Sequence, residues 1–106
     1  MQFRGGMNEM MRQAARMQRK VEQAKEQLKD KELTSTAIGV KVKATITYGK
    51  KVVRIEIDPA FLQSEGLELA LDGVCAAINT GLDEAGKAMD AEVEKVTGGI
   101  KIPGVP

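Results

Sequence analysis

Three arginines and a lysine form the most suggestive group of side chains in the sequence. Arg12, Arg16 and Arg19 recur at spacings of four and three residues, and Lys20 follows them. On a helix these spacings place the side chains on one face. Guanidinium groups bind phosphate oxygens well, and no acidic residue lies within residues 12–21. The row could therefore follow a nucleic-acid backbone, or it could be an ordinary solvated face, as charged runs often are.

The charges are distributed unevenly along the chain, although the net charge of the 106 residues is only +1. Residues 1–31 contain eight basic and four acidic side chains, a balance of +4. Residues 32–58 contain five and three, or +2, whereas residues 59–106 contain three and eight, or −5. This asymmetry indicates an acidic partner for the basic end, or attraction within the molecule, or only a contribution to solubility.

The residues that usually carry catalysis are scarce. The chain has no histidine and a single cysteine, Cys75, and neither Ser35 nor Ser64 has a base at a recognisable spacing. Cys75 falls on an apolar helical pattern, which predicts a small core residue. We therefore expect no enzyme, cofactor, metal or small-molecule substrate. The absence of a long apolar run predicts no membrane span and favours a cytoplasmic protein.

A long helix is expected to carry the arginine row. Apolar residues recur every three or four positions from Met7, which predicts a helix to Lys31, about 37 Å long. Residues 1–6 are expected to be a flexible lead-in. The heptad row that defines the opposite face consists of Met7, Met10, Ala14, Met17, Val21, Ala24 and Leu28.

Alternation of apolar and polar residues predicts three antiparallel strands next. Residues 40–47 and 53–58 alternate with a period of two, which is typical of strands with one buried face. Residues 32–38 form a weaker pattern that predicts an edge strand turning at Gly39. The expected sheet is therefore a meander.

A two-residue turn at Gly49-Lys50 would match the two strong strands residue by residue. The charged side chains would then oppose each other, which supports this register. The expected pairs are Val42–Ile57, Ala44–Ile55 and Ile46–Val53 on the apolar face, and Lys41–Asp58, Lys43–Glu56 and Thr45–Arg54 on the polar face.

The acidic half of the chain is expected to be mostly helical. Asp58 and Pro59 resemble a helix start, giving a short turn through Leu62. Periodicity then predicts a helix over residues 67–97, stopped by Gly98-Gly99, with an irregular tail at residues 99–106.

Glycines inside the second long helix need an explanation, because each costs roughly 1 kcal/mol relative to alanine. Gly73, Gly81 and Gly86 could mark close approach of the sheet or of another helix, or they could be tolerated without a structural reason. The sequence leaves both explanations open.

The expected lengths predict an assembly. Helices of about 37 and 46 Å outrun a strand of about 27 Å, so an apolar row must extend beyond the sheet. A second copy is the simplest cover. We therefore expect one α+β domain over residues 1–106, with a long N-terminal helix, a three-stranded antiparallel meander and a long C-terminal helix, that forms a homodimer.

Several motifs resemble one known family. MRQAARMQRKVEQAKEQL, VRIEIDPAFL, VCAAIN and VTGGIKIPG occur in the order found in the YbaB/EbfC nucleoid-associated proteins. The resemblance spans nearly the whole chain. It implies a bacterial protein of the cytoplasm and nucleoid that binds double-stranded DNA as a tweezer-like homodimer, with possible effects on nucleoid organisation and gene expression.

The resemblance and the charges together suggest the binding residues. Family members often carry basic residues in the second long helix, where this chain has acidic ones, so we expect DNA contact from the first helix. The predicted DNA-binding residues are Arg12, Arg16, Arg19 and Lys20, with Lys41 and Lys43 as weaker candidates because acids oppose them. The alternative is a protein interaction or scaffold module that uses the heptad helix.

Overall fold

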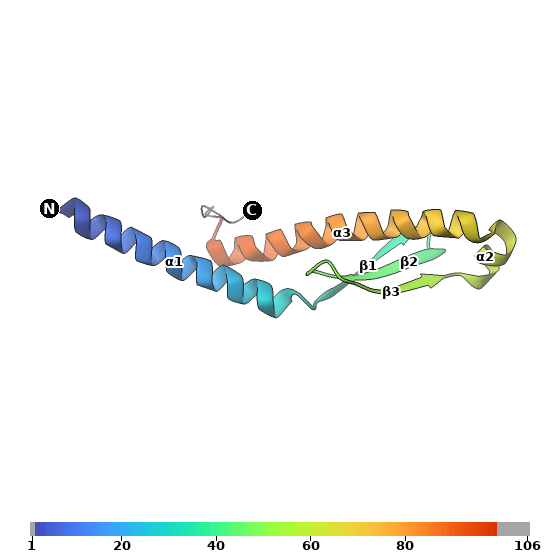
Figure 1. Cartoon of the computed structure of the whole chain (residues 1–106), viewed down its shortest axis with the longest axis horizontal. Coiled ribbons are helices and arrows are strands. Elements are labelled where there is room, and N and C mark those ends of the chain that lie inside the picture. Colours follow the sequence, from blue (N-terminus) through green and yellow to red (C-terminus); the bar gives the residue numbers. More distant parts are fainter. Residues whose placement is uncertain (1, 100–106) are drawn as a thin grey trace.

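The molecule is a long rod in which one long helix lies along a face of the sheet and the other continues past the end of that sheet (Figure 1). The computed structural model describes the backbone of residues 2–99 and the side chains of residues 6–99. The rod measures 76 × 18 × 17 Å. Its elements are α1 (Gln2–Leu28), β1 (Glu32–Ala37), β2 (Val42–Thr47), β3 (Val52–Ile57), α2 (Pro59–Glu65) and α3 (Leu67–Thr97). This order confirms the expected α+β fold.

Helix α1 is longer at its start than the sequence pattern predicts. It begins at Gln2, so residues 2–6, expected to be a flexible lead-in, are helical. The glycine pair in that segment weakens a helix but does not break it, because glycine can still adopt helical torsion angles. The helix ends at Leu28, short of the expected Lys31, and a turn at residues 29–30 leads into β1.

The sheet is the expected meander, in the order β1-β2-β3. Both pairs of neighbouring strands are antiparallel. Away from the β2–β3 turn the predicted register is confirmed, because Val42 pairs with Ile57 and Lys43 with Glu56. The central strand β2 buries Val42, Ala44 and Ile46 completely.

The β2–β3 turn differs from the prediction. Its loop has three residues, 48–50, and Thr47 accepts a hydrogen bond from the Lys50 amide at 2.9 Å. The positive φ of 68° falls on Lys50 rather than Gly49. Ile46 consequently pairs with Val52, not Val53, and a bulge beside Thr45 restores the predicted register. The extra loop residue and the bulge thus compensate for each other.

The β1–β2 connection also starts earlier than expected. Strand β1 ends at Ala37, and Ile38 and Gly39 both have positive φ, 53° and 66°. Val40 was predicted to join the buried face of β2, but it lies in this turn and is 69% exposed. The predicted strand began at Val40, whereas β2 begins at Val42, because alternation alone does not show where strand pairing begins.

Helix α2 reverses the chain. The Asp58 carboxylate accepts a hydrogen bond from the Ala60 amide at 3.0 Å, and Pro59 is the first helical residue. This confirms the predicted start. The helix continues past Leu62 to Glu65 and ends at Gly66, whose φ is 91°.

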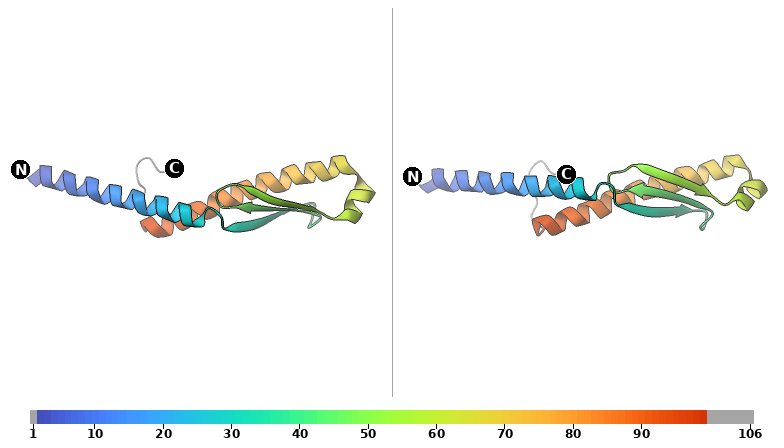
Figure 2. Two further views of the ribbon diagram at one scale, coloured as in Figure 1. Left: turned by 60° about the horizontal axis from the view of Figure 1, so that its bottom comes forward. Right: turned by 90° about the horizontal axis from the view of Figure 1, so that it is seen from below.

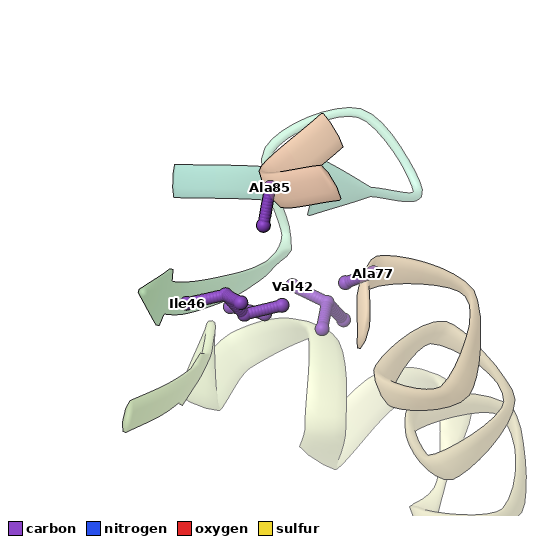
Figure 3. Packing of buried hydrophobic residues seen from close by; sticks show 5 residues of the cluster. Val42, Ile46, Ala77 and Ala85 are labelled. Atoms are coloured by element: carbon purple, nitrogen blue, oxygen red, sulfur yellow. The ribbon is translucent and has the colours of Figure 1, made fainter. Parts of the chain in front are cut away.

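Helix α3 lies on one face of the sheet through its smallest residues. Ala70, Gly73, Ala77, Gly81 and Ala85 are buried. Ala77 and Ala85 belong to the core cluster with Val42 and Ile46 of β2 (Figure 3). An added Cβ at Gly73 would lie 2.8 Å from Ile38 Cδ1, and one at Gly81 would overlap Ile46. Close approach of the sheet therefore explains two of the three helical glycines. At Gly86 a Cβ would make only ordinary contact, with Lys50 at 3.4 Å.

The two long helices meet only near the C-terminal ends of both (Figure 2). Val21 of α1 and Val93 of α3 are buried there, with Met17, Met89 and Val96 packed around them. The N-terminal half of α1 extends beyond the end of α3 (Figure 1). Helix α3 ends as predicted, with Gly98 at φ 65° and its amide donating to the Glu94 carbonyl.

Candidate nucleic-acid interface

The arginine row lies on the solvent side of α1. Arg12, Arg16, Arg19 and Lys20 are all exposed. Val21, at the centre of the contact with α3, is 2% exposed and lies on the opposite side of the helix by its spacing. The structure therefore brings the four predicted residues together on one accessible face, which we call the arginine face.

The arginine face is largely free of acidic partners. Arg12 approaches Glu9 at 3.8 Å, and both side chains are more than half exposed. Among residues 6–99, Arg16, Arg19 and Lys20 have no acidic group within 4.0 Å. A single long, exposed ion pair contributes little and is readily exchanged for another anion. Most of the positive charge on this face is thus available to a partner.

A second surface of α1 is apolar and uncovered. Met7, Met10 and Met11 are 63%, 70% and 67% exposed, because they precede the contact with α3. Met7 and Met10 continue the heptad row whose later member Val21 is buried against α3, and Met11 lies beside that row. Exposed apolar side chains in a row of this kind are typical of an interaction surface. The part of α1 that carries Arg12 is therefore also the part that lacks cover.

Of the two strand lysines, Lys41 is paired and Lys43 is not, among residues 6–99. Lys41 bonds Asp58 at 3.2 Å, and this bond, followed by the one from the Ala60 amide, lowers the pKa of Asp58. Lys43 faces Glu56 as predicted, but the Glu56 carboxylate binds Arg54 at 3.4 Å instead. Lys43 therefore keeps its charge free among residues 6–99.

The strand lysines also lie apart from the arginine face. They are at the start of β2, whereas the end of β2 leads to the turn that touches the end of α1. Figure 1 shows the length of the sheet between them. The structure does not combine these two groups into one patch.

A further cluster of lysines was not predicted. The backbone of the β2–β3 turn bonds residues 29 and 31, so that Lys51 lies near Lys29, and Lys50 stands beside them with its side chain over Gly86 of α3. Their spacing in the sequence gives no hint of this, because the contact depends on how the turn folds back. The sequence showed only that the segment after α1 and the β2–β3 turn each contain two lysines close together.

Helix α3 offers little to an anionic partner. It carries most of the acidic residues of the C-terminal half, and Cys75, predicted to be in the core, is exposed. Cys75 lies two residues from the buried Gly73 and Ala77, which places it on the side of α3 that faces away from the sheet. In residues 2–99 no cluster of three or more acidic, cysteine or histidine side chains could hold a metal ion. No helix in that range is long and apolar enough to span a membrane.

Comparison with known proteins identifies consistent relatives. The family model of the YbaB/EbfC DNA-binding family matches residues 3–100. A nucleoid-associated protein of Thermoanaerobacter sp. is 38% identical over 105 residues, covering 97% of this chain and 95% of the relative. One from Clostridium acetobutylicum is 33% identical over 101 residues, covering 95% and 90%.

A solved structure supports the fold. The crystal structure of an uncharacterized protein from Helicobacter pylori matches with a TM-score of 0.55 at 23% identity. The match covers 76% of this chain and 89% of the other. At this identity the likeness concerns the fold alone.

Proposed function

Because the chain belongs to the YbaB/EbfC DNA-binding family, we propose that it is a nucleoid-associated protein that binds duplex DNA as a homodimer. Binding is mainly to phosphates, through the arginine face of α1. In the cell this places the protein in the nucleoid, where it influences DNA organisation and gene expression. The observation that carries the proposal is an exposed row of cations of which three lack an acidic partner.

The mechanism is charge neutralisation. Each phosphate contacted by a cationic side chain releases condensed counterion, which makes binding strongly dependent on salt. The arginine face has no helix-turn-helix or other base-reading arrangement around it, so contact to the backbone dominates. Affinities of the order of 10⁻⁴ to 10⁻⁶ M are expected for such non-specific binding at physiological salt.

The homodimer is supported by the uncovered row of α1. Met7 and Met10 extend the apolar side beyond α3, and burying such side chains contributes about 1.5 to 3 kcal/mol each. A second copy that covers this row would hold two arginine faces in one assembly. Two faces that grip one duplex would give the tweezer-like shape.

Neutralising the arginine face tests DNA binding. A variant with Arg12→Gln, Arg16→Gln and Arg19→Gln should lose at least a hundredfold in affinity for a fluorescent duplex at low salt, because three phosphate contacts per chain are removed. The matched control neutralises three lysines elsewhere: Lys25→Gln, Lys87→Gln and Lys95→Gln. Equal affinity of the arginine variant and this control would overturn the assignment of the face.

The dimer has its own test. Wild type should sediment as a dimer, whereas Met10→Glu should dissociate at least tenfold more readily, because a charge would enter the apolar contact. Gln13→Glu is the control, since it adds the same charge to α1 outside the apolar row. A wild type that stays monomeric at high micromolar concentration would contradict the dimer.

The same apolar row favours one alternative, a scaffold module whose α1 binds another protein. Such a complex would form by apolar burial and would persist at high salt, whereas a phosphate complex would dissociate. Failure of wild type to bind duplex DNA at low salt would favour this alternative.

A further inference from the structure

Two lysine-bearing backbone segments that are distant in the sequence are fixed side by side. The Gly49 amide donates to the Lys29 carbonyl at 2.9 Å, and the Tyr48 amide donates to the Lys31 carbonyl at 2.8 Å. These bonds satisfy two backbone carbonyls in the segment that follows α1. They also hold the backbone of the β2–β3 turn against residues 29–31. The Lys51 side chain lines a recess there together with Lys29, whereas the Lys50 side chain reaches toward α3, where its Nζ lies 3.5 Å from the position of a Cβ on Gly86. We call Lys29, Lys31, Lys50 and Lys51 the tip cluster.

The approach of the turn to α1 is specific. A Cβ on Gly49 would lie 3.0 Å from the Lys29 carbonyl oxygen, so only glycine fits without a shift. The next residue, Lys50, has a φ of 68°, a conformation that costs a residue with a Cβ roughly 1 kcal/mol or more. Glycine or asparagine would adopt it more easily. A lysine held in this conformation is a reason to look for a function of its charge.

The tip cluster keeps some of its charge unpaired. Lys29 is neutralised by Glu26 at 2.7 Å, which raises the pKa of Lys29. The Lys31 ammonium lies 5.4 Å from the centre of the Tyr48 ring, a weak cation–π contact. Within residues 6–99, Lys50 and Lys51 have no acidic group within 4.0 Å.

The surface beside Lys29 and Lys51 is hollowed. A recess of about 220 Å³ opens to solvent there, lined by Lys29, Asp30, Thr47, Gly49 and Lys51. Asp30 is the acidic residue in this lining, and Glu32 follows the cluster at the start of β1. The free cations of the cluster are therefore the two lysines of the turn and, in part, Lys31.

The tip cluster lies within reach of a duplex bound to the arginine face. Along α1 the distance from Arg12 to Lys29 is about 26 Å, at 1.5 Å per residue. One turn of B-DNA covers about 34 Å. A single turn of duplex is thus long enough to meet both groups of cations.

We propose that Lys50 and Lys51, held against the end of α1, form a second phosphate-binding surface that extends the DNA contact of the arginine face. This rests on the proposed function. The tip cluster binds the sugar-phosphate backbone and reads no bases, because ammonium groups act as point charges on phosphate. Each of the two lysines contributes up to one phosphate contact per chain.

The test neutralises the turn without disturbing its backbone. A variant with Lys50→Asn and Lys51→Gln keeps the turn, because asparagine tolerates positive φ. Removing two phosphate contacts should make the slope of log K against log salt shallower by about 1.8 per chain, and weaken duplex binding at least tenfold at 0.1 M salt. The control, Lys87→Gln with Lys95→Gln, removes the same charge from acidic α3. Circular dichroism and the thermal midpoint confirm that both variants are folded.

Each outcome decides between the two claims. If wild type binds duplex and the turn variant binds like the control, with an unchanged slope, the tip surface is wrong and the arginine face stands. If wild type binds no duplex at low salt, the proposed function fails and the tip surface fails with it. If only the turn variant loses affinity and slope, the tip surface is established.

Discussion

The two long helices have similar lengths but opposite surroundings. Helix α3 buries glycine and alanine against the sheet along most of its length, whereas α1 is packed only near Val21 and exposes both its cations and its methionines. Helix α3 therefore carries much of the stability, and α1 carries the charge that a partner can reach. The helix that we propose to bind DNA is thus the one that the rest of the chain covers least.

The largest expected effect concerns α3, the helix that packs on the sheet. Gly81→Ala should lower the free energy of unfolding by about 1 to 3 kcal/mol, because its Cβ would overlap Ile46 and press on Ser35 Cβ at 3.1 Å. Gly86→Ala is the matched control. Its Cβ meets only Lys50, so the gain in helix propensity should stabilise the protein by up to about 1 kcal/mol.

Urea unfolding of both variants gives the measurement. If the two alanines changed stability in the same direction, tight packing of the sheet would not explain Gly81. The two helices would then differ less than their burial suggests.

The sequence predicted well what depends on local periodicity. The bounds of α3, the strand order and the pairs Val42–Ile57 and Lys43–Glu56 follow from alternating or helical patterns that one buried face imposes. The arginine face was predicted for the same reason, since helical spacing alone places its residues together. The sequence did not decide why position 73 is a glycine, because only the packed structure shows that the Ile38 side chain lies against it.

What the sequence could not give depends on tertiary contacts. The three-residue loop at residues 48–50 is favoured by hydrogen bonds to Thr47 and to the Lys29 carbonyl, which no spacing reveals. The lysine cluster at the turn was missed with it. Val40 and Cys75 were placed in the core because a pattern shows apolar character but not where the covering element ends.

A smaller effect tests whether releasing a positive charge on α1 matters more for DNA binding than releasing one on α3. Glu9→Gln removes the acidic partner that the arginine face has among residues 6–99, so duplex affinity should rise about two- to fivefold, as expected for an exposed pair worth up to about 1 kcal/mol. The matched control is Glu92→Gln, which releases Lys95 on α3 from a pair at 3.2 Å. An equal gain from the control would show that net charge, rather than the α1 face, sets affinity.

The smallest effect concerns the turn that joins the sheet to the helices. The pKa of Asp58 is lowered by Lys41 and by the Ala60 amide, so its contribution to stability is present above its unfolded pKa and is lost as pH falls below about 4. Asp58→Asn should flatten the fall of the thermal midpoint in this range. If the thermal midpoint of the variant fell at low pH as steeply as that of wild type, these contacts would not contribute to stability. DNA binding by the variant at neutral pH should equal that of wild type.

The salt dependence of duplex binding by the wild-type protein tests the central claim most directly. Four phosphate contacts per chain, eight per dimer, predict that log K falls against log salt with a slope of about −7, and more steeply if the tip cluster contributes. A steep linear slope would support binding through the cations that α1 leaves uncovered. A slope shallower than about −2, or no binding at low salt, would contradict the account.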